Sequence, residues 1–194
     1  GVCFTGSIET AKRIERAMAA NLAPDAPLIA ETGGLNAMIV DSTALPEQAV
    51  RDIVASAFQS AGQRCSALRL LYLQEDIAES FMEMLLGAMN ELCLGDPWNH
   101  ATDVGPVIDE TARDGILAHI EAARAEGRLI HQLPAPATGH FVGPAILRVS
   151  GMADLDREVF GPVLHVATFR AGETDAVVDA VNAAGYGLPF GLHT

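Results

Sequence analysis

Basic side chains are scarce in this sequence. Its 194 residues include 12 lysines and arginines against 25 aspartates and glutamates, which gives a formal net charge of −13 at pH 7. A surface this acidic repels phosphate backbones and anionic lipid head groups, so nucleic-acid binding is not expected. The sequence also lacks an apolar run long enough to cross a bilayer and a basic, then apolar, N-terminus typical of a signal peptide. These absences predict a cytoplasmic protein with no transmembrane segment.

Cysteine is also rare. Cys3, Cys65 and Cys93 are widely spaced and odd in number, which suits a reducing compartment better than a disulfide framework. The six histidines show no spacing typical of a metal site, so no metal is expected. Hydrophobic residues make up 49% of the chain, enough for a folded domain with a real core.

Short apolar runs alternate with longer amphipathic stretches. The pattern predicts strands at residues 1–6, 26–31, 36–40, 68–73, 128–133, 141–149, 163–169 and 190–194. It predicts helices at residues 7–22, 46–61, 76–92, 109–127 and 173–184, with Ser7 as an N-cap, Pro46 in a first turn and Gly62 as a stop. This alternation is typical of an α/β fold with a mostly parallel sheet. The sequence starts inside a strand–turn–helix unit and stops where another strand begins. We therefore expect a piece of a longer protein that is truncated at both ends.

Cys65 is the first candidate for chemistry. A free cysteine is most often a buried, inert thiol, and Cys3 and Cys93 are interpreted as such packing residues. Cys65 differs because it lies in a helix-to-strand connection, where Gly62 and Ser66 leave room for a substrate. The adjacent Arg64 is a cation that favours a thiolate. A nucleophile and a packed thiol both fit these local features.

Three other stretches are ambiguous when taken alone. Glu31 ends an apolar strand before two glycines, where it is either a solvated loop acid or a general base that activates water. Glu158 and Phe160 precede a Gly-Pro turn that has an ordinary structural explanation. The glycine turn at residues 4–7 opens a helix and could hold a phosphate, but it lacks the G-x-G-x-x-G spacing.

Taken together, these stretches form an ordered set: "FTGS" (4–7), "ETGG" (31–34), "GQRC" (62–65) and "EVFGPV" (158–163). The set resembles the NAD(P)-dependent aldehyde dehydrogenase superfamily over nearly the whole chain, and the glutamate and cysteine are 34 positions apart (65 − 31), as in the catalytic pair of that family. "SAFQSAGQRCSALRLLYLQEDIAE" and "DVGPVIDE" resemble its Δ1-pyrroline-5-carboxylate (L-glutamate γ-semialdehyde) dehydrogenase branch. Within that branch they are most similar to the dehydrogenase domain of the bifunctional bacterial proline utilization A family.

The resemblance implies a role for each matching residue. Cys65 is the implied nucleophile, Glu31 the general base, and Ser66 a hydroxyl that helps hold the distal carboxylate of the substrate. The implied NAD contacts near the phosphates are Gly6 and Ser7. Those near the nicotinamide are Thr32, Gly33 and Phe160, and Glu158 is implied to hold the nicotinamide ribose. The implied reaction oxidises L-glutamate γ-semialdehyde to glutamate in proline catabolism, through a hemithioacetal and a thioester on Cys65.

The resemblance also implies a domain organisation. Residues 1–33 match the C-terminal remnant of a Rossmann-type NAD-binding domain, and residues 34–194 match a catalytic domain that is incomplete at its C-terminus. FAD is implied only for a proline dehydrogenase domain that could precede this chain in a bifunctional parent. The parent is expected to be a homo-oligomer acting on a small molecule.

Three alternatives remain open from the sequence. The first is another semialdehyde dehydrogenase of the same superfamily. The second is a cysteine hydrolase or acyl-transfer module, which the lack of a recognisable histidine partner for Cys65 disfavours. The third concerns the isolated chain, which is expected to be a catalytically inert fragment or binding module because the family's oxyanion asparagine and most of its NAD-binding domain lie outside it.

Overall fold

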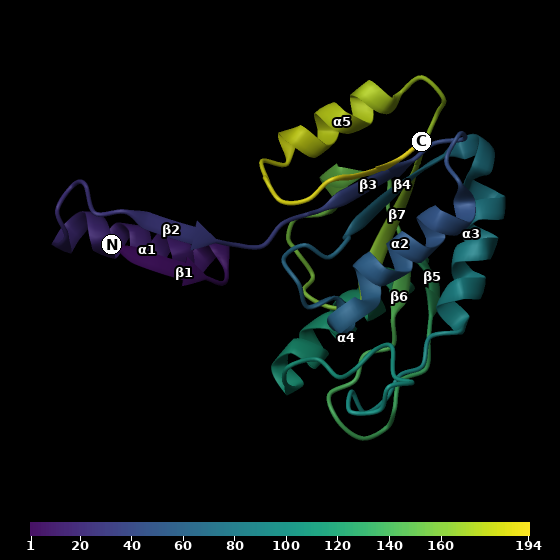
Figure 1. The fold of residues 1–194 in the computed structure, drawn as a ribbon, viewed down its shortest axis with the longest axis horizontal. Helices are drawn as coiled ribbons and strands as arrows, with labels where there is room; N and C mark the ends of the chain where they lie inside the picture. The colour runs from purple at the N-terminus through teal and green to yellow at the C-terminus, as the bar shows by residue number, and fades with distance from the viewer. The chain divides into compact units, whose positions relative to one another are not determined.

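The computed structural model describes residues 1–194, which form two units, Gly1–Gly34 and Leu35–Thr194 (Figure 1). In the smaller unit, β1 (Val2–Thr5) pairs in parallel with β2 (Leu28–Glu31), and α1 (Ile8–Asn21) connects the two strands. The predicted N-cap is confirmed, because the Ser7 hydroxyl accepts a hydrogen bond from the backbone N–H three residues later at 3.2 Å.

The larger unit is built around a six-stranded sheet with the order β5-β6-β7-β4-β3-β8. Only β5 is antiparallel to its neighbour, which confirms the predicted mostly parallel α/β fold. The strands are β3 (Ala37–Val40), β4 (Leu70–Gln74), β5 (Leu129–Gln132), β6 (Ala145–Arg148), β7 (Val163–Phe169) and β8 (Gly191–His193). The helices are α2 (Pro46–Phe58), α3 (Glu75–Asn90), α4 (Glu110–Ala125) and α5 (Thr174–Ala183), with short 3₁₀ segments η1 (Gln59–Gly62) and η2 (Met152–Asp154).

Helices cover both faces of this sheet (Figure 1). α2, α3 and α4 pack on one face in a core that includes Val40 and Leu71, whereas α5 belongs to a second core on the other face that includes Ile39 and Tyr72. Successive side chains of a strand point to opposite faces of the sheet. Because both faces are covered, β3 and β4 are buried along their whole length. Burial on both faces is the physical reason for the continuous apolar runs of these strands.

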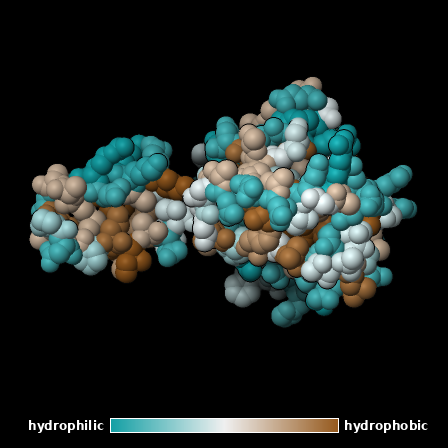
Figure 2. All heavy atoms as spheres, turned by 90° about the horizontal axis from the view of Figure 1, so that it is seen from above, coloured by the Kyte–Doolittle hydropathy of each residue, from teal (hydrophilic) through white to brown (hydrophobic).

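The surface of the larger unit is mixed. On the face drawn in Figure 2, its hydrophobic residues form small groups between hydrophilic ones. No helix of the structure combines the length and the apolar character that crossing a bilayer requires.

The predicted end of one helix is wrong. α2 begins at Pro46 as predicted, but it ends at Phe58 instead of continuing to Ala61. Ser60 and Ala61 have left-handed backbone angles, with φ of 56° and 53°, which an α-helix cannot contain. These two residues turn the chain toward Cys65 within η1.

The strand predicted at residues 141–149 is shorter in the structure, where β6 begins only at Ala145. Pro144 has no N–H to donate to a neighbouring strand. At Gly143 the backbone passes so close to Leu133 that an added Cβ would lie 1.8 Å from the Leu133 carbonyl oxygen. A close approach of the two backbones therefore replaces the first part of the predicted strand.

Candidate active site

Three loops meet at the amino ends of β3, β4 and β7, which are adjacent and parallel. Asn36 precedes β3, Cys65 precedes β4, and the segment 157–162 precedes β7. Because the strands of a parallel set start at the same edge, the sheet brings these loops together. The candidate residues Cys65, Glu158 and Phe160 thus belong to one region of the larger unit.

Cys65 lies in an exposed turn whose backbone is held by hydrogen bonds from the buried Asn36 side chain. Its thiol is free and exposed. The side-chain amide of Asn36, which is only 5% exposed, donates to the backbone carbonyls of Cys65 and Ala67, both at 2.7 Å. The Asn36 carbonyl in turn accepts from the backbone N–H of Arg69 at 2.9 Å. The backbone of the turn is therefore fixed while its thiol faces outward.

The segment before Cys65 packs against the loop that precedes β7. Gly62 has a left-handed φ of 66°, and a Cβ added there would lie 2.1 Å from the carbonyl oxygen of Gly161. Only glycine fits at this position without moving one of the two loops. Gln63 adds a second tie, because its side chain donates to the Pro106 carbonyl at 3.3 Å and accepts from the Ile108 N–H at 2.8 Å.

Arg69 connects the Cys65 turn to Glu158. Its side chain is 1% exposed, and its Nε and Nη2 donate to Glu158 Oε1 at 3.1 and 2.8 Å. The same guanidinium donates through Nη1 to the Gly161 carbonyl at 3.1 Å and through Nη2 to the Arg64 carbonyl at 3.0 Å. Its carbon Cζ also lies 5.4 Å from the centre of the Phe160 ring. One buried cation therefore contacts both loops of the candidate site.

The charges around Arg69 offset only part of the effect of its burial. Removal from water lowers the pKa of Arg69, while the Glu158 carboxylate acts in the opposite direction through its charge and its hydrogen bonds. The sequence suggests Arg64 as the cation beside Cys65, but the Arg64 guanidinium is turned back to Ser60 and Gln59, at 3.0 and 3.3 Å. Arg69, by contrast, is connected to the Cys65 turn through the Arg64 carbonyl.

A pocket of about 550 Å³ opens beside these residues. Its wall combines the Glu158 carboxylate and the Arg157 cation with apolar side chains, among them Ile116, Val159 and Phe160. A carboxylate accepts hydrogen bonds from hydroxyl groups, and an aromatic ring packs against a flat ring. This hydrogen-bond acceptor and this apolar surface fit the nicotinamide riboside end of NAD.

Ser66 is exposed next to Cys65 in the larger unit, and the other predicted residues lie in the smaller unit, at one end of its two strands. The Gly6 N–H donates to the Glu31 carbonyl at 3.0 Å, which ties the turn at Gly6 and Ser7 to the end of β2. Glu31 is exposed, and the following Thr32 and Gly33 are half-buried. The carboxyl ends of β1 and β2 therefore present the predicted general base and the predicted phosphate-side turn together.

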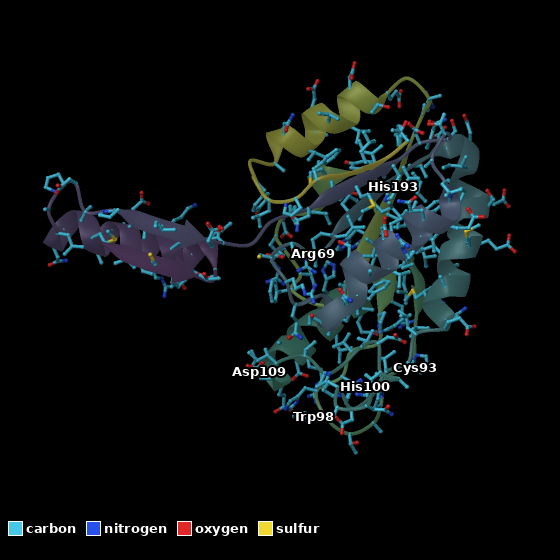
Figure 3. The ribbon with its side chains drawn as sticks, viewed as in Figure 1. Arg69, Cys93, Trp98, His100, Asp109 and His193 are labelled. Carbon is cyan, nitrogen blue, oxygen red and sulfur yellow. The ribbon has the colours of Figure 1, made fainter.

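The interpretation of the other two cysteines as packing residues is wrong, since Cys3 and Cys93 are both exposed. Cys3 lies on the outward face of β1, where exposed and half-buried residues alternate. Cys93 follows α3 in a turn, with its N–H bonded to the Asp103 carboxylate at 2.8 Å. Figure 3 shows Cys93 well apart from Arg69.

Three residues of the site were not predicted from the sequence: Asn36, Gln63 and Arg69. Asn36 and Gln63 act through backbone groups of distant loops, and such contacts leave no local pattern. Arg69 does carry a signal, because it is a charged residue at the start of a buried apolar strand. A buried arginine is rare unless it is paired, so this position predicts a partner but not its identity.

Similarity to known proteins extends along the whole chain. The model of the aldehyde dehydrogenase family matches residues 1–194. The bifunctional protein PutA of Klebsiella aerogenes is 50% identical over the whole chain, and the 1-pyrroline-5-carboxylate dehydrogenase of Geobacillus kaustophilus is 37% identical over 96% of it. The chain spans only 16% of the former protein and 37% of the latter.

Solved structures give the same result. A variant of Bradyrhizobium japonicum proline utilization A superimposes with a TM-score of 0.96 at 54% identity, over the whole chain and 20% of that structure. Betaine aldehyde dehydrogenase from Staphylococcus aureus in complex with NAD⁺ superimposes with a TM-score of 0.90 at 29% identity, over the whole chain and 39% of that structure.

Proposed function

Since this chain belongs to the aldehyde dehydrogenase family, we propose that it is the nucleophile-bearing segment of an NAD-dependent L-glutamate γ-semialdehyde dehydrogenase that acts in proline catabolism. The observation that carries this proposal is the exposed Cys65 thiol on an anchored turn, connected through Arg69 to the pocket lined by Glu158 and Phe160. The substrate class is supported by the names of the relatives, PutA and 1-pyrroline-5-carboxylate dehydrogenase.

Cys65 is the proposed nucleophile. Its sulfur forms a bond to the aldehyde carbon, and the carbonyl oxygen takes up a proton, which gives a hemithioacetal. Loss of a hydride and a proton converts this adduct into a thioester, and NAD⁺ supplies the hydride acceptor. A thiolate suits both halves of the reaction, because it attacks readily and later leaves readily.

The second half of the proposed reaction is hydrolysis. Glu31 removes a proton from the attacking water, the C–S bond breaks, and the acid is released with regeneration of the Cys65 thiol. The exposure of Glu31 at the end of β2 is compatible with access to water. The backbone N–H of Cys65 is the proposed donor to the oxyanion that forms in each addition step.

Binding roles follow from the residue types. Glu158 is proposed to accept hydrogen bonds from the nicotinamide ribose, and Phe160 to pack against the nicotinamide ring. Gly6, Ser7, Thr32 and Gly33 are proposed to contact the cofactor from the smaller unit. Ser66, exposed next to the nucleophile, is the proposed donor to the distal carboxylate of the substrate.

The cellular location and the oligomeric state of the parent protein are also part of the proposal. The cytoplasm is the proposed location, because three free cysteines suit a reducing compartment. The parent protein is proposed to be a homo-oligomer, and the isolated 194-residue chain is proposed to be inactive.

The first test replaces the nucleophile in the full-length parent. Cys65→Ala should abolish NADH formation from L-glutamate γ-semialdehyde, because it removes the sulfur that forms the proposed covalent adduct. Cys3→Ala and Cys93→Ala are matched controls, since these thiols are also exposed, and they should retain wild-type turnover in an absorbance assay. Near-normal turnover by Cys65→Ala would overturn the proposed function. Faster turnover of another semialdehyde by the wild-type parent would reassign the substrate within the same family.

A further inference from the structure

Arg69 is a buried cation at a position where the neighbouring side chains are apolar and pack in the core. It immediately precedes β4, between Leu68 and Leu70, and both of these neighbours are buried. Burying an arginine has a high desolvation cost, and well-packed apolar residues often stabilise a protein as much as a buried ion pair does. Its placement therefore calls for an explanation other than fold stability.

The side-chain hydrogen bonds of Arg69 all go to the candidate site. Its guanidinium reaches the Glu158 carboxylate twice, the Gly161 carbonyl and the Arg64 carbonyl, at distances of 2.8 to 3.1 Å. The planar guanidinium holds its donors in a fixed arrangement, so acceptors on two loops are fixed relative to each other. A hydrogen bond to a charged partner is also stronger than one between neutral groups.

Two of the groups that Arg69 contacts face the pocket. Glu158 and Phe160 both line it, whereas Arg69 itself does not. The Glu158 side chain is 14% exposed, so it is accessible from the pocket while two of its contacts come from the buried cation. The guanidinium lies over the Phe160 ring, which limits the positions that this half-exposed ring can occupy.

We propose that Arg69 is the positioning residue of the nicotinamide riboside site. It holds the Glu158 carboxylate and the Phe160 ring in the orientation that receives the cofactor. Through its hydrogen bond to the Arg64 carbonyl, it also fixes the position of the loop that carries Glu158 and Phe160 relative to the Cys65 turn. This inference rests on the proposed function, because it takes Glu158 as the residue that binds the ribose.

The test measures NAD⁺ affinity by calorimetric titration of the full-length parent, without aldehyde. Arg69→Met has similar volume and no donors, and it should weaken NAD⁺ binding by about tenfold to a hundredfold, the equivalent of one charge-assisted hydrogen bond. Arg69→Lys keeps the charge without the planar donor arrangement and should give an intermediate affinity. Arg124→Met is the matched control, since the ion pair of Arg124 with Glu121 is exposed, and it should bind NAD⁺ as the wild type does.

A double-mutant cycle separates positioning from general stability. In a Glu158→Ala background, Arg69→Met should change the NAD⁺ affinity by less than about threefold, because the group that it positions is gone. An equal loss in both backgrounds would overturn the inference. If Arg69→Met does not fold, as judged by the loss of its melting transition, Arg69→Lys decides. Wild-type NAD⁺ affinity in that variant would overturn the inference.

Failure of the proposed function has a different signature. Wild-type NAD⁺ affinity in Glu158→Ala would remove the ribose role of Glu158, and the positioning role with it. Weakened binding in Glu158→Ala together with wild-type affinity in both Arg69 variants would overturn the positioning role alone.

Discussion

At the scale of single residues, Gly62 determines how closely two loops of the candidate site approach each other. It has a left-handed backbone angle, and it faces the Gly161 carbonyl without any space for a Cβ. Cys65 follows three residues later, so the contact between Gly62 and Gly161 sets the point from which the nucleophile turn begins. The residue acts through backbone shape, with no side chain of its own.

Gly62→Ala should therefore be strongly destabilising. The added methyl group meets a carbonyl oxygen in addition to the left-handed strain, so we expect a loss of more than about 2 kcal/mol in the free energy of unfolding of the 194-residue chain. Gly172→Ala is a matched control, because Gly172 has a φ of 85° but nothing within 4 Å of its added Cβ. It should lose only about 1 kcal/mol, the conformational part of the cost. Equal losses for the two variants in urea unfolding would show that the loops separate easily.

At the scale of elements, α4 and β7 are joined by two histidines behind the site. The Arg69 carbonyl accepts from the His165 backbone N–H at 2.9 Å and lies 3.0 Å from Nδ1 of the same residue. A carbonyl can only accept, so Nδ1 of His165 carries a hydrogen and its Nε2 accepts from Nε2 of His119 at 3.0 Å. The neutral form of His165 therefore satisfies every contact that it makes.

This pair predicts a pH dependence of stability. Burial lowers the pKa of His165 to about 4, and the nearby cations Arg128 and Arg69 and the neighbouring His119 act in the same direction. In the unfolded chain the imidazole has its ordinary pKa of about 6.5, so between about pH 6.5 and pH 4 the unfolded state binds more protons. The stability that neutral His165 contributes is complete above that range and is lost as the pH falls through it.

His165→Asn should remove this dependence while keeping a donor near the Arg69 carbonyl. Between about pH 7 and pH 5, the wild-type chain should lose about 2 kcal/mol more of its free energy of unfolding than the variant does. Urea unfolding of both proteins at the two pH values measures the difference. Parallel losses would mean that other groups, chiefly carboxylates, dominate the acid response.

Local chemistry explains which elements could be predicted. The Ser7 cap and the Pro46 start depend on neighbouring backbone groups, and both appear in the structure. The end of α2 depends instead on how η1 packs against Gly161, which is distant in sequence. The ion pair of Arg69 with Glu158 joins residues 89 positions apart, so no periodicity could reveal it.

At the scale of the whole molecule, the two units differ in how much core they contain. In Gly1–Gly34, Ala11 is the one buried hydrophobic residue, and two strands and one helix make up the unit. Leu35–Thr194 has helices on both faces of a six-stranded sheet and two hydrophobic cores. Segments below about 40 residues without disulfides or metals rarely fold alone, so only the larger unit is expected to be stable by itself.

The 194-residue chain should consequently be inactive in isolation. The proposed NAD⁺ contacts at Gly6, Ser7, Thr32 and Gly33 belong to the smaller unit, and hydride transfer depends on close positioning of the reacting groups. Hydrogen exchange should be fast at the amides of β1 and β2 and slow in β3, β4 and β7. NAD⁺ titration and an NADH absorbance assay on the same sample should detect neither micromolar binding nor steady turnover. Slow exchange in β1 and β2 together with micromolar NAD⁺ affinity and turnover would mean that the smaller unit is ordered and sufficient for the cofactor.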